Sequence, residues 1–266
     1  MKTRTIKNSI LVCQPNNEDG FYLNDRLWTK SSPEFSNWQA CVEFCSNRNM
    51  LLQTLDDAVE FRYKTNGADN SNYYQVTSTL IAMALDEVAG IRAYIFEPDQ
   101  EEIRILLKRQ EIIQNKSHIS LDISEDLGQR VKRFANKTGR TFIMPDEDLQ
   151  LDIKPNESGQ SSYGTSVYVA ALLPKYAEQN AKYILAYQAE QNSISMFIYQ
   201  EKVYPDNQAL GCVCFARPKL EHGQMILLPV GLGGEDDLIN YIFADDSFYL
   251  WGLARGHDAN PPNLFK

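Results

Sequence analysis

Residues 229–241 read PVGLGGEDDLINY, and the role of the glycines in this segment separates the main classes of fold. Gly231, Gly233 and Gly234 follow an apolar run, so the segment is either a phosphate-binding loop or a turn between two strands. A dinucleotide loop needs G-x-G-x-x-G between a strand and a helix, and a P-loop needs Gly-Lys-Ser/Thr. Here three carboxylates follow the glycines without any Lys or Arg, and like charges repel phosphate. The segment therefore predicts a turn between strands.

A cation site is the alternative interpretation of this acidic turn. Between Gly231 and Asp258 there are six carboxylates and one basic residue, Arg255. Calcium and magnesium prefer such oxygen ligands, but the spacing matches no EF-hand loop. Solvated turns at the end of a sheet explain the same residues, so no metal site is assigned.

Short strands are predicted on both sides of this turn. A helix that starts at Pro174 and reaches about Ala189 precedes them, because proline fits the first turn of a helix. The strands are expected at 194–198, Cys212–Phe215, Met225–Val230, Leu238–Phe243 and Phe248–Leu253. Such a run of short strands is typical of an antiparallel meander.

The N-terminal half shows helical periodicity and capping patterns. The apolar residues Trp38, Cys41, Val42 and Cys45 recur at i, i+3, i+4 and i+7, which predicts a helix with one buried stripe.

Further helices are predicted to begin at capping residues. Thr54 and Asp99 are each followed three residues later by an acidic residue, the pattern of a capping box. Ser124 is expected to cap another helix that ends at Gly139. The predicted inner face of that helix consists of Leu127, Val131, Phe134 and Ala135.

The run 76–89 is apolar almost throughout and predicts a buried helix. Its β-branched residues, among them Val76, Thr79 and Ile81, leave a strand as the alternative. Strands are expected at Lys7–Cys13, Arg92–Phe96 and Ile119–Ile123.

We therefore expect an α+β fold with a helix-rich N-terminal half and a C-terminal antiparallel β-meander packed with helices. Residues 152–166, DIKPNESGQSSYGTS, predict a linker or an exposed loop because Ser, Gly, Asn and Gln dominate them. The expected division is a helix-rich α+β region at 1–151, this linker, and a helix plus antiparallel sheet at 167–266. One continuous domain is the alternative.

Composition narrows the class of protein. The chain has 266 residues, of which 43% are apolar, and a formal net charge of −9. This charge disfavours nucleic acid and anionic lipid and suits solubility or a basic partner. Five cysteines, an odd number, favour reduced thiols over a disulfide framework. No apolar run approaches the roughly 18 residues of a membrane span, so a cytoplasmic location is expected.

The cysteines are candidate zinc ligands or nucleophiles. Cys41-x3-Cys45 and Cys212-x-Cys214 lack the paired spacing of a zinc knuckle, and buried packing explains them. No nucleophile elbow or cysteine-protease signature is present. We predict no cofactor and no metal.

His257, Asp258 and Arg255 form the most polar cluster that holds a histidine, and they are the candidate catalytic residues if the chain is an enzyme.

Two segments resemble known families. ISLDISEDLGQRVKRFANKTGR, 119–140, resembles part of a ribbon–helix–helix repressor, but the second helix is missing, so a solvated basic helix face is preferred. MILLPVGLGGEDDLINYIFADDSFYLWG, 225–252, resembles the middle of SUKH-type immunity proteins over fewer than 30 residues. The upstream glycine-bearing motif of that family is not recognisable, and we do not assign the chain to it.

These patterns favour a non-catalytic, acidic protein of the immunity-protein or adaptor type that binds another protein with a basic surface. Acidic and aromatic residues of the C-terminal turns are the expected partner-binding surface, since aromatic residues often anchor interfaces. They are Glu235, Asp236, Asp237, Asp245, Asp246, Tyr249 and Trp251. The alternatives are an enzyme that acts on a small molecule or protein, and a structural or virion component.

Overall fold

The computed structural model describes part of the chain. The described residues are 4–6, 9–13, 19–23, 26–29, 38–47, 50–58, 75–88, 90–112, 118–153, 167–174, 184–190, 193–199, 211–232, 239–241 and 254–256.

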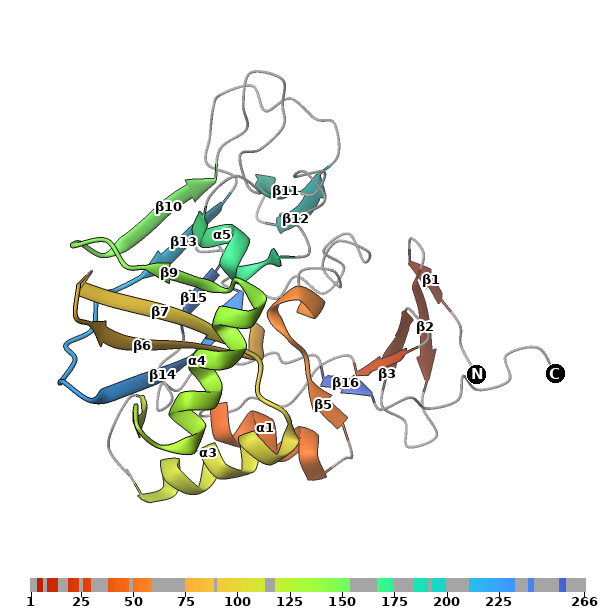
Figure 1. Ribbon diagram of the computed structural model, residues 1–266. Helices are drawn as coiled ribbons and strands as arrows, with labels where there is room; N and C mark the ends of the chain where they lie inside the picture. The colour runs from red at the N-terminus through yellow and green to blue at the C-terminus, as the bar shows by residue number, and fades with distance from the viewer. Residues whose placement is uncertain are drawn as a thin grey trace.

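Helices and antiparallel strands combine in a mixed α+β fold (Figure 1). The strands of its central sheet are β6 (Gln75–Asp86), β7 (Gly90–Phe96), β8 (Ile119–Asp122), β9 (Thr141–Ile143), β10 (Leu149–Ile153), β13 (Gly211–Phe215), β14 (Gln224–Leu232) and β15 (Ile239–Tyr241). Their order is β10-β13-β15-β14-β6-β7-β9, and β8 also pairs with β14.

The described C-terminal strands β13, β14 and β15 join strands of the N-terminal part and do not form a separate meander, whereas the strand predicted at Phe248–Leu253 lies outside the described residues. Strand β14 pairs antiparallel with β6 from Met225 to Leu232, and β13 runs parallel to β15. The N-terminal and C-terminal parts of the chain therefore share one sheet. The register of β14 against β6 shifts between Pro229 and Gly231, which marks a β-bulge.

Strands β14 and β15 pair antiparallel, with Gly231 opposite Asn240. This pairing agrees with the predicted strand-to-strand turn. Gly231 itself belongs to β14, whereas Gly233 and Gly234 lie outside the described residues.

Two smaller sheets complete the strands. The first contains β1 (Arg4–Ile6), β2 (Ser9–Cys13), β3 (Asp19–Leu23), β4 (Arg26–Thr29), β16 (Ala254–Gly256) and β5 (Met50–Leu52), in that spatial order. The second is a hairpin of β11 (Ile184–Glu190) and β12 (Ser193–Tyr199).

Most strands of the first small sheet come from the N-terminal half, which is therefore richer in strands than predicted. The hairpin also corrects the helix predicted from Pro174 to Ala189, since its last six residues are extended.

Helices α1 (Trp38–Asn47), α3 (Gln100–Ile112) and α4 (Asp126–Thr138) pack over one face of the central sheet, and α5 (Val167–Leu172) lies by β9 (Figure 1). All three helices on the sheet face were predicted from the sequence. A single helical turn at 55–58 begins at the predicted capping box, in which Thr54 and Asp57 exchange 3.2 Å backbone-to-side-chain hydrogen bonds.

The run 76–89 contains a strand and not the predicted buried helix. Alternate residues of β6 point to opposite faces of the sheet, and both sets are buried. Leu80 and Ala82 belong to the core shared with the helices, whereas Ile81 and Met83 are buried outside that core cluster. A strand buried on both faces reads as a continuous apolar run, which explains the error.

The ends of α4 differ in how well they were predicted. Gly139 ends the helix in the left-handed conformation with φ 68°, as expected. The N-cap is Glu125, whose side chain makes no capping hydrogen bond, and not Ser124. The Ser124 hydroxyl instead donates to Oδ1 of Asp122 at 2.6 Å.

The Arg140 side chain is buried. It belongs to the segment 119–140, for which the sequence predicted a solvated basic helix face. Its guanidinium donates to the carbonyl oxygens of Ala171 and Leu172 at 2.9 and 2.8 Å, and to Glu97. These carbonyls lie at the C-terminal end of α5, where a cation is favourable. Arg140 thus joins the end of α4, the segment after β7 and α5.

Candidate functional site

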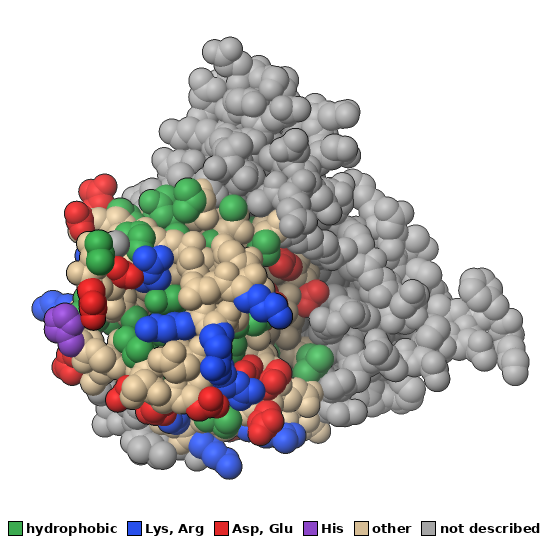
Figure 2. All heavy atoms as spheres, in the orientation of Figure 1, with side chains coloured by type: hydrophobic (Ala, Val, Ile, Leu, Met, Phe, Trp, Pro, Cys, Tyr) green, Lys and Arg blue, Asp and Glu red, His purple; other side chains and the backbone are tan. Residues whose placement is uncertain are grey.

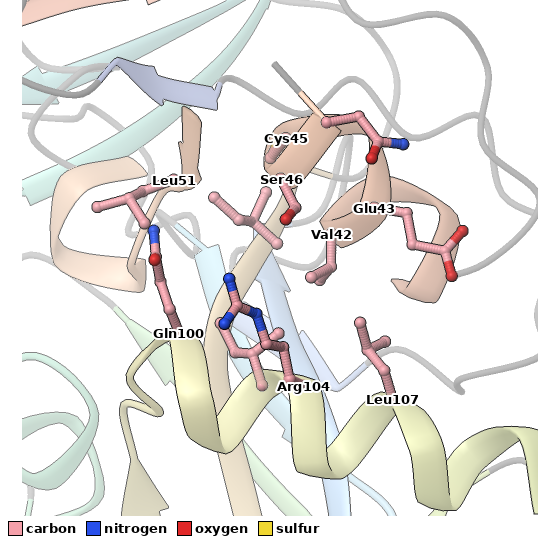
Figure 3. A pocket seen from close by; sticks show the side chains of 11 residues that line it. Val42, Glu43, Cys45, Ser46, Leu51, Gln100, Arg104 and Leu107 are labelled. Atoms are coloured by element: carbon pink, nitrogen blue, oxygen red, sulfur yellow. The ribbon is translucent and has the colours of Figure 1, made fainter. Parts of the chain in front are cut away.

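A pocket of about 110 Å³ lies between α1, β5 and α3 (Figure 3). Its apolar lining consists of Val42, Cys45, Leu51, Leu52, Ile103 and Leu107. Its polar lining consists of Glu43, Ser46, Asn47, Gln100 and Arg104, all of them exposed. An apolar floor below a ring of exposed polar groups is the arrangement of a binding pocket.

The wall formed by α1 follows from its apolar stripe. Trp38, Cys41, Val42 and Cys45 are all buried, as their spacing predicted. The indole Nε1 of Trp38 donates a 3.1 Å hydrogen bond to the carbonyl oxygen of Thr77 in β6. This bond fixes the start of α1 against the sheet. Val42 and Cys45, further along the same helix, line the pocket.

The wall formed by α3 begins at the predicted capping box. The backbone N–H of Asp99 donates to Glu102 at 2.9 Å, and the backbone N–H of Glu102 donates to Asp99 at 2.8 Å. Buried Glu102 also pairs with Arg130 of α4 at 3.4 Å. These contacts fix the rotation of α3, so that Leu106 is buried in the core while Leu107 lines the pocket.

Charge at the pocket mouth is divided between its two walls. Glu43 on α1 accepts a 2.7 Å hydrogen bond from Gln39. Arg104 on α3 extends toward the pocket (Figure 3), and no ion pair or hydrogen bond of its side chain is found among the described residues. An exposed guanidinium without a carboxylate partner can bind one from another molecule.

Neighbouring arginines of α3 and α4 are paired. Arg109 contacts Glu125, Arg130 contacts Glu102, and Arg133 lies 3.8 Å from Asp126. Acidic and basic side chains are accordingly interspersed on the face seen in Figure 2. Arg104 differs from this pattern, because it has no carboxylate partner among the described residues.

The Cys41 thiol, on the buried stripe of α1, is a poor nucleophile. Cys41 and Cys45 are free and buried. The hydrogen bond between them and burial raise the pKa of Cys41 well above its ordinary value. Because the thiolate is the reactive form, Cys41 remains an unreactive thiol near neutral pH. The pocket therefore offers apolar contact and a cation.

A second polar feature lies inside the core. Gln53 donates to the carbonyl oxygen of Val76 at 3.3 Å, and Thr77 donates to the carbonyl oxygen of Val230 at the β14 bulge. Thr79 accepts from the backbone N–H of Leu55 at 2.9 Å. These bonds attach residues 53–55 to β6, and Oε1 of Gln53 remains without a partner. The pocket between α1, β5 and α3 is not lined by these residues.

The structure describes one of the three predicted catalytic residues, Arg255. Arg255 lies in β16, with its backbone opposite Leu51 of β5, the strand that borders the pocket. His257 and Asp258 lie outside the described residues, as do all seven predicted partner-binding residues, Glu235, Asp236, Asp237, Asp245, Asp246, Tyr249 and Trp251.

The described ranges contain no group of three or more His, Cys, Asp or Glu side chains arranged to hold a metal ion. They also contain no helix that combines the length and the apolar character of a membrane span.

Sequence reasoning missed the pocket because it identified α1 and α3 only as separate helices and did not predict β5. The signal was present in α3, where Gln100, Arg104 and Leu107 recur at helical spacing beside the buried position Leu106. No pattern within one helix shows which neighbour faces such a stripe.

Comparison with known proteins gave no relative. No protein family matches the chain, and no curated protein or solved structure is significantly similar to it. The function must therefore be argued from the residues themselves.

Proposed function

We propose that this chain is a non-catalytic protein of the immunity-protein or adaptor type that binds another protein with a basic surface. The observation that carries the proposal is the α1–α3 pocket, the space lined by Val42, Cys45, Leu51, Ile103 and Leu107 beneath a polar mouth. Protein interfaces concentrate their binding energy where one anchor side chain enters such a desolvated pocket.

The size of the pocket favours a side chain over a substrate. Sites for small molecules and cofactors usually enclose about 300–1,000 Å³. The α1–α3 pocket measures about 110 Å³, which is below the roughly 150 Å³ cavity that holds one benzene molecule.

The charge of the whole chain supports a basic partner. A net charge of −9 accelerates encounter with a positively charged surface. This effect weakens as the salt concentration rises, because salt screens the charges. The acidic residues Asp236, Asp237, Asp245 and Asp246 are the proposed contacts for this long-range attraction. The pocket would then supply the short-range anchor.

Affinity capture from lysate of the source cells, with the tagged full chain, tests this proposal. We expect one partner protein of basic composition, captured at low salt and progressively lost at high salt. The double substitution Asp236→Asn with Asp237→Asn is expected to weaken capture at low salt. The proposal is wrong if no protein is captured above the level of an unrelated acidic control, or if the captured protein is acidic.

A further inference from the structure

Resting on the proposed function, the geometry points to the kind of segment that the partner inserts. We propose that the α1–α3 pocket takes one Leu, Ile or Met side chain of the partner, and that a carboxylate within two residues of this anchor pairs with Arg104. A single carboxylate beside the anchor is compatible with a partner whose surface is basic overall.

The volume and lining of the pocket select an aliphatic anchor. A volume of about 110 Å³ fits a single side chain and is well below that of a small-molecule site. The floor is formed by branched side chains and a thiol, from Val42, Cys45, Ile103 and Leu107. An apolar side chain of four heavy atoms, which makes close contact with these groups, gains from burial without leaving a polar atom unsatisfied.

Arg104 selects the charge next to the anchor. Its guanidinium is exposed at the α3 side of the mouth and has no ion pair within the described residues, whereas Arg109, Arg130 and Arg133 have one each. Guanidinium pairs with carboxylate through two parallel hydrogen bonds.

Glu43 selects the charge on the opposite side. It lies on α1, across the mouth from Arg104 (Figure 3), and repels a second carboxylate. A basic residue of the partner is favourable there. The two walls thus carry opposite charges, which fixes the direction in which the partner segment crosses the pocket.

Small probes that mimic the anchor test this inference on the full chain. N-acetyl-L-leucine carries the aliphatic side chain and the carboxylate, N-acetyl-L-leucinamide lacks the charge, and N-acetylglycine lacks the side chain. Each is titrated into ¹⁵N-labelled protein, with the backbone amide signals of Val42, Cys45, Ile103 and Leu107 as the readout.

We expect saturable shifts with N-acetyl-L-leucine, roughly tenfold weaker binding of N-acetyl-L-leucinamide, and no saturable shifts with N-acetylglycine. Arg104→Gln is expected to make the first two probes bind equally. Ser46→Trp, which places a bulky ring at the mouth, abolishes binding, whereas Asn136→Trp on the exposed face of α4 preserves it.

Three results would overturn the inference. Equal binding of the first two probes to the unmodified protein removes the role of the carboxylate. Absence of shifts at all four amides removes the aliphatic anchor. Shifts of these amides with protein concentration alone assign the pocket to a second copy of the chain. None of these three results affects the salt-sensitive capture of a partner. The proposed function is therefore tested independently of this inference.

Discussion

Arg140 donates from Nη1 to Oε1 of Glu97 at 2.5 Å, and the arginine side chain is only 5% exposed. The same guanidinium donates to the carbonyl oxygens of Ala171 and Leu172. The Arg140 backbone carbonyl also accepts from Ile95 in β7 at 2.9 Å. One side chain and its backbone therefore connect α4, α5 and the central sheet.

Substitution of Arg140 by Ala is expected to lower the free energy of unfolding by about 3–5 kcal/mol, because it leaves Glu97 and two carbonyl oxygens without their donor. Urea denaturation followed by circular dichroism measures the change. Arg133→Ala is the control, since Arg133 is 69% exposed and 3.8 Å from Asp126. It should cost about 1 kcal/mol or less. Equal losses in the two variants would contradict the clamping role of Arg140.

Gly128→Ala is expected to destabilise the protein although Gly128 lies inside α4. Alanine normally stabilises a helix by about 1 kcal/mol relative to glycine. Here an added Cβ would lie 2.6 Å from the carbonyl oxygen of Asp122 and 3.0 Å from that of Ile123, both rigid backbone atoms. The first turn of α4 must then move away from β8. A thermal unfolding midpoint at or above that of the unmodified protein would show that this close approach is absent.

Asp122 is expected to make stability depend on pH. Ser124 donates to its carboxylate from both N–H and hydroxyl, which lowers the pKa of Asp122 in the folded protein. A lowered folded-state pKa stabilises the fold above the unfolded pKa of about 3.9, and this contribution is lost as the pH falls through the folded-state value.

Asp122→Asn should therefore be less stable than the unmodified protein at pH 7. The difference should shrink below about pH 4, as the aspartate becomes protonated. Urea titrations of both proteins at several pH values measure it. A difference that stays constant over the pH range in which both proteins are folded would show that the charge of Asp122 is not responsible.

Cys41 is expected to resist alkylation in the folded protein. Its hydrogen bond with Cys45 and its burial raise the pKa of Cys41, and both conditions disappear on unfolding. Iodoacetamide treatment at pH 8 with and without urea, followed by peptide mass spectrometry, compares the two states. Modification of Cys41 at similar rates in both would contradict a buried thiol.

Sequence patterns predicted the helices because their determinants are local. The stripe from Trp38 to Cys45 and the capping box of Asp99 with Glu102 each lie within a few residues, and the structure confirms both. Ser124 failed as a cap because Asp122, two residues before it, competes for its hydroxyl.

The strand order could not be predicted because it depends on pairing between distant segments. Leu80 of β6 lies opposite Pro229 of β14, although nearly 150 residues separate them in the sequence. No pattern in either strand specifies the other. Strand β6 was misread for a related reason: burial on both faces removes the alternation that identifies a strand. Its β-branched residues Val76, Thr79 and Ile81 were the correct signal.

The α1–α3 pocket could not be predicted either, since its walls come from α1, β5 and α3 and depend on how these elements pack. The C-terminal acidic residues, which the sequence did single out, remain a prediction. Recognition through the pocket is the part of the proposal that the described residues can test directly.

The most direct test compares the affinity of the purified partner, once captured, for the full chain and two tryptophan variants. Ser46→Trp fills the pocket mouth, and Asn136→Trp adds the same side chain on the exposed face of α4. We predict a dissociation constant roughly tenfold or more higher for the Ser46 variant and unchanged for the Asn136 variant, with both variants folded by circular dichroism. Unchanged affinity of the Ser46 variant would contradict partner binding through the α1–α3 pocket.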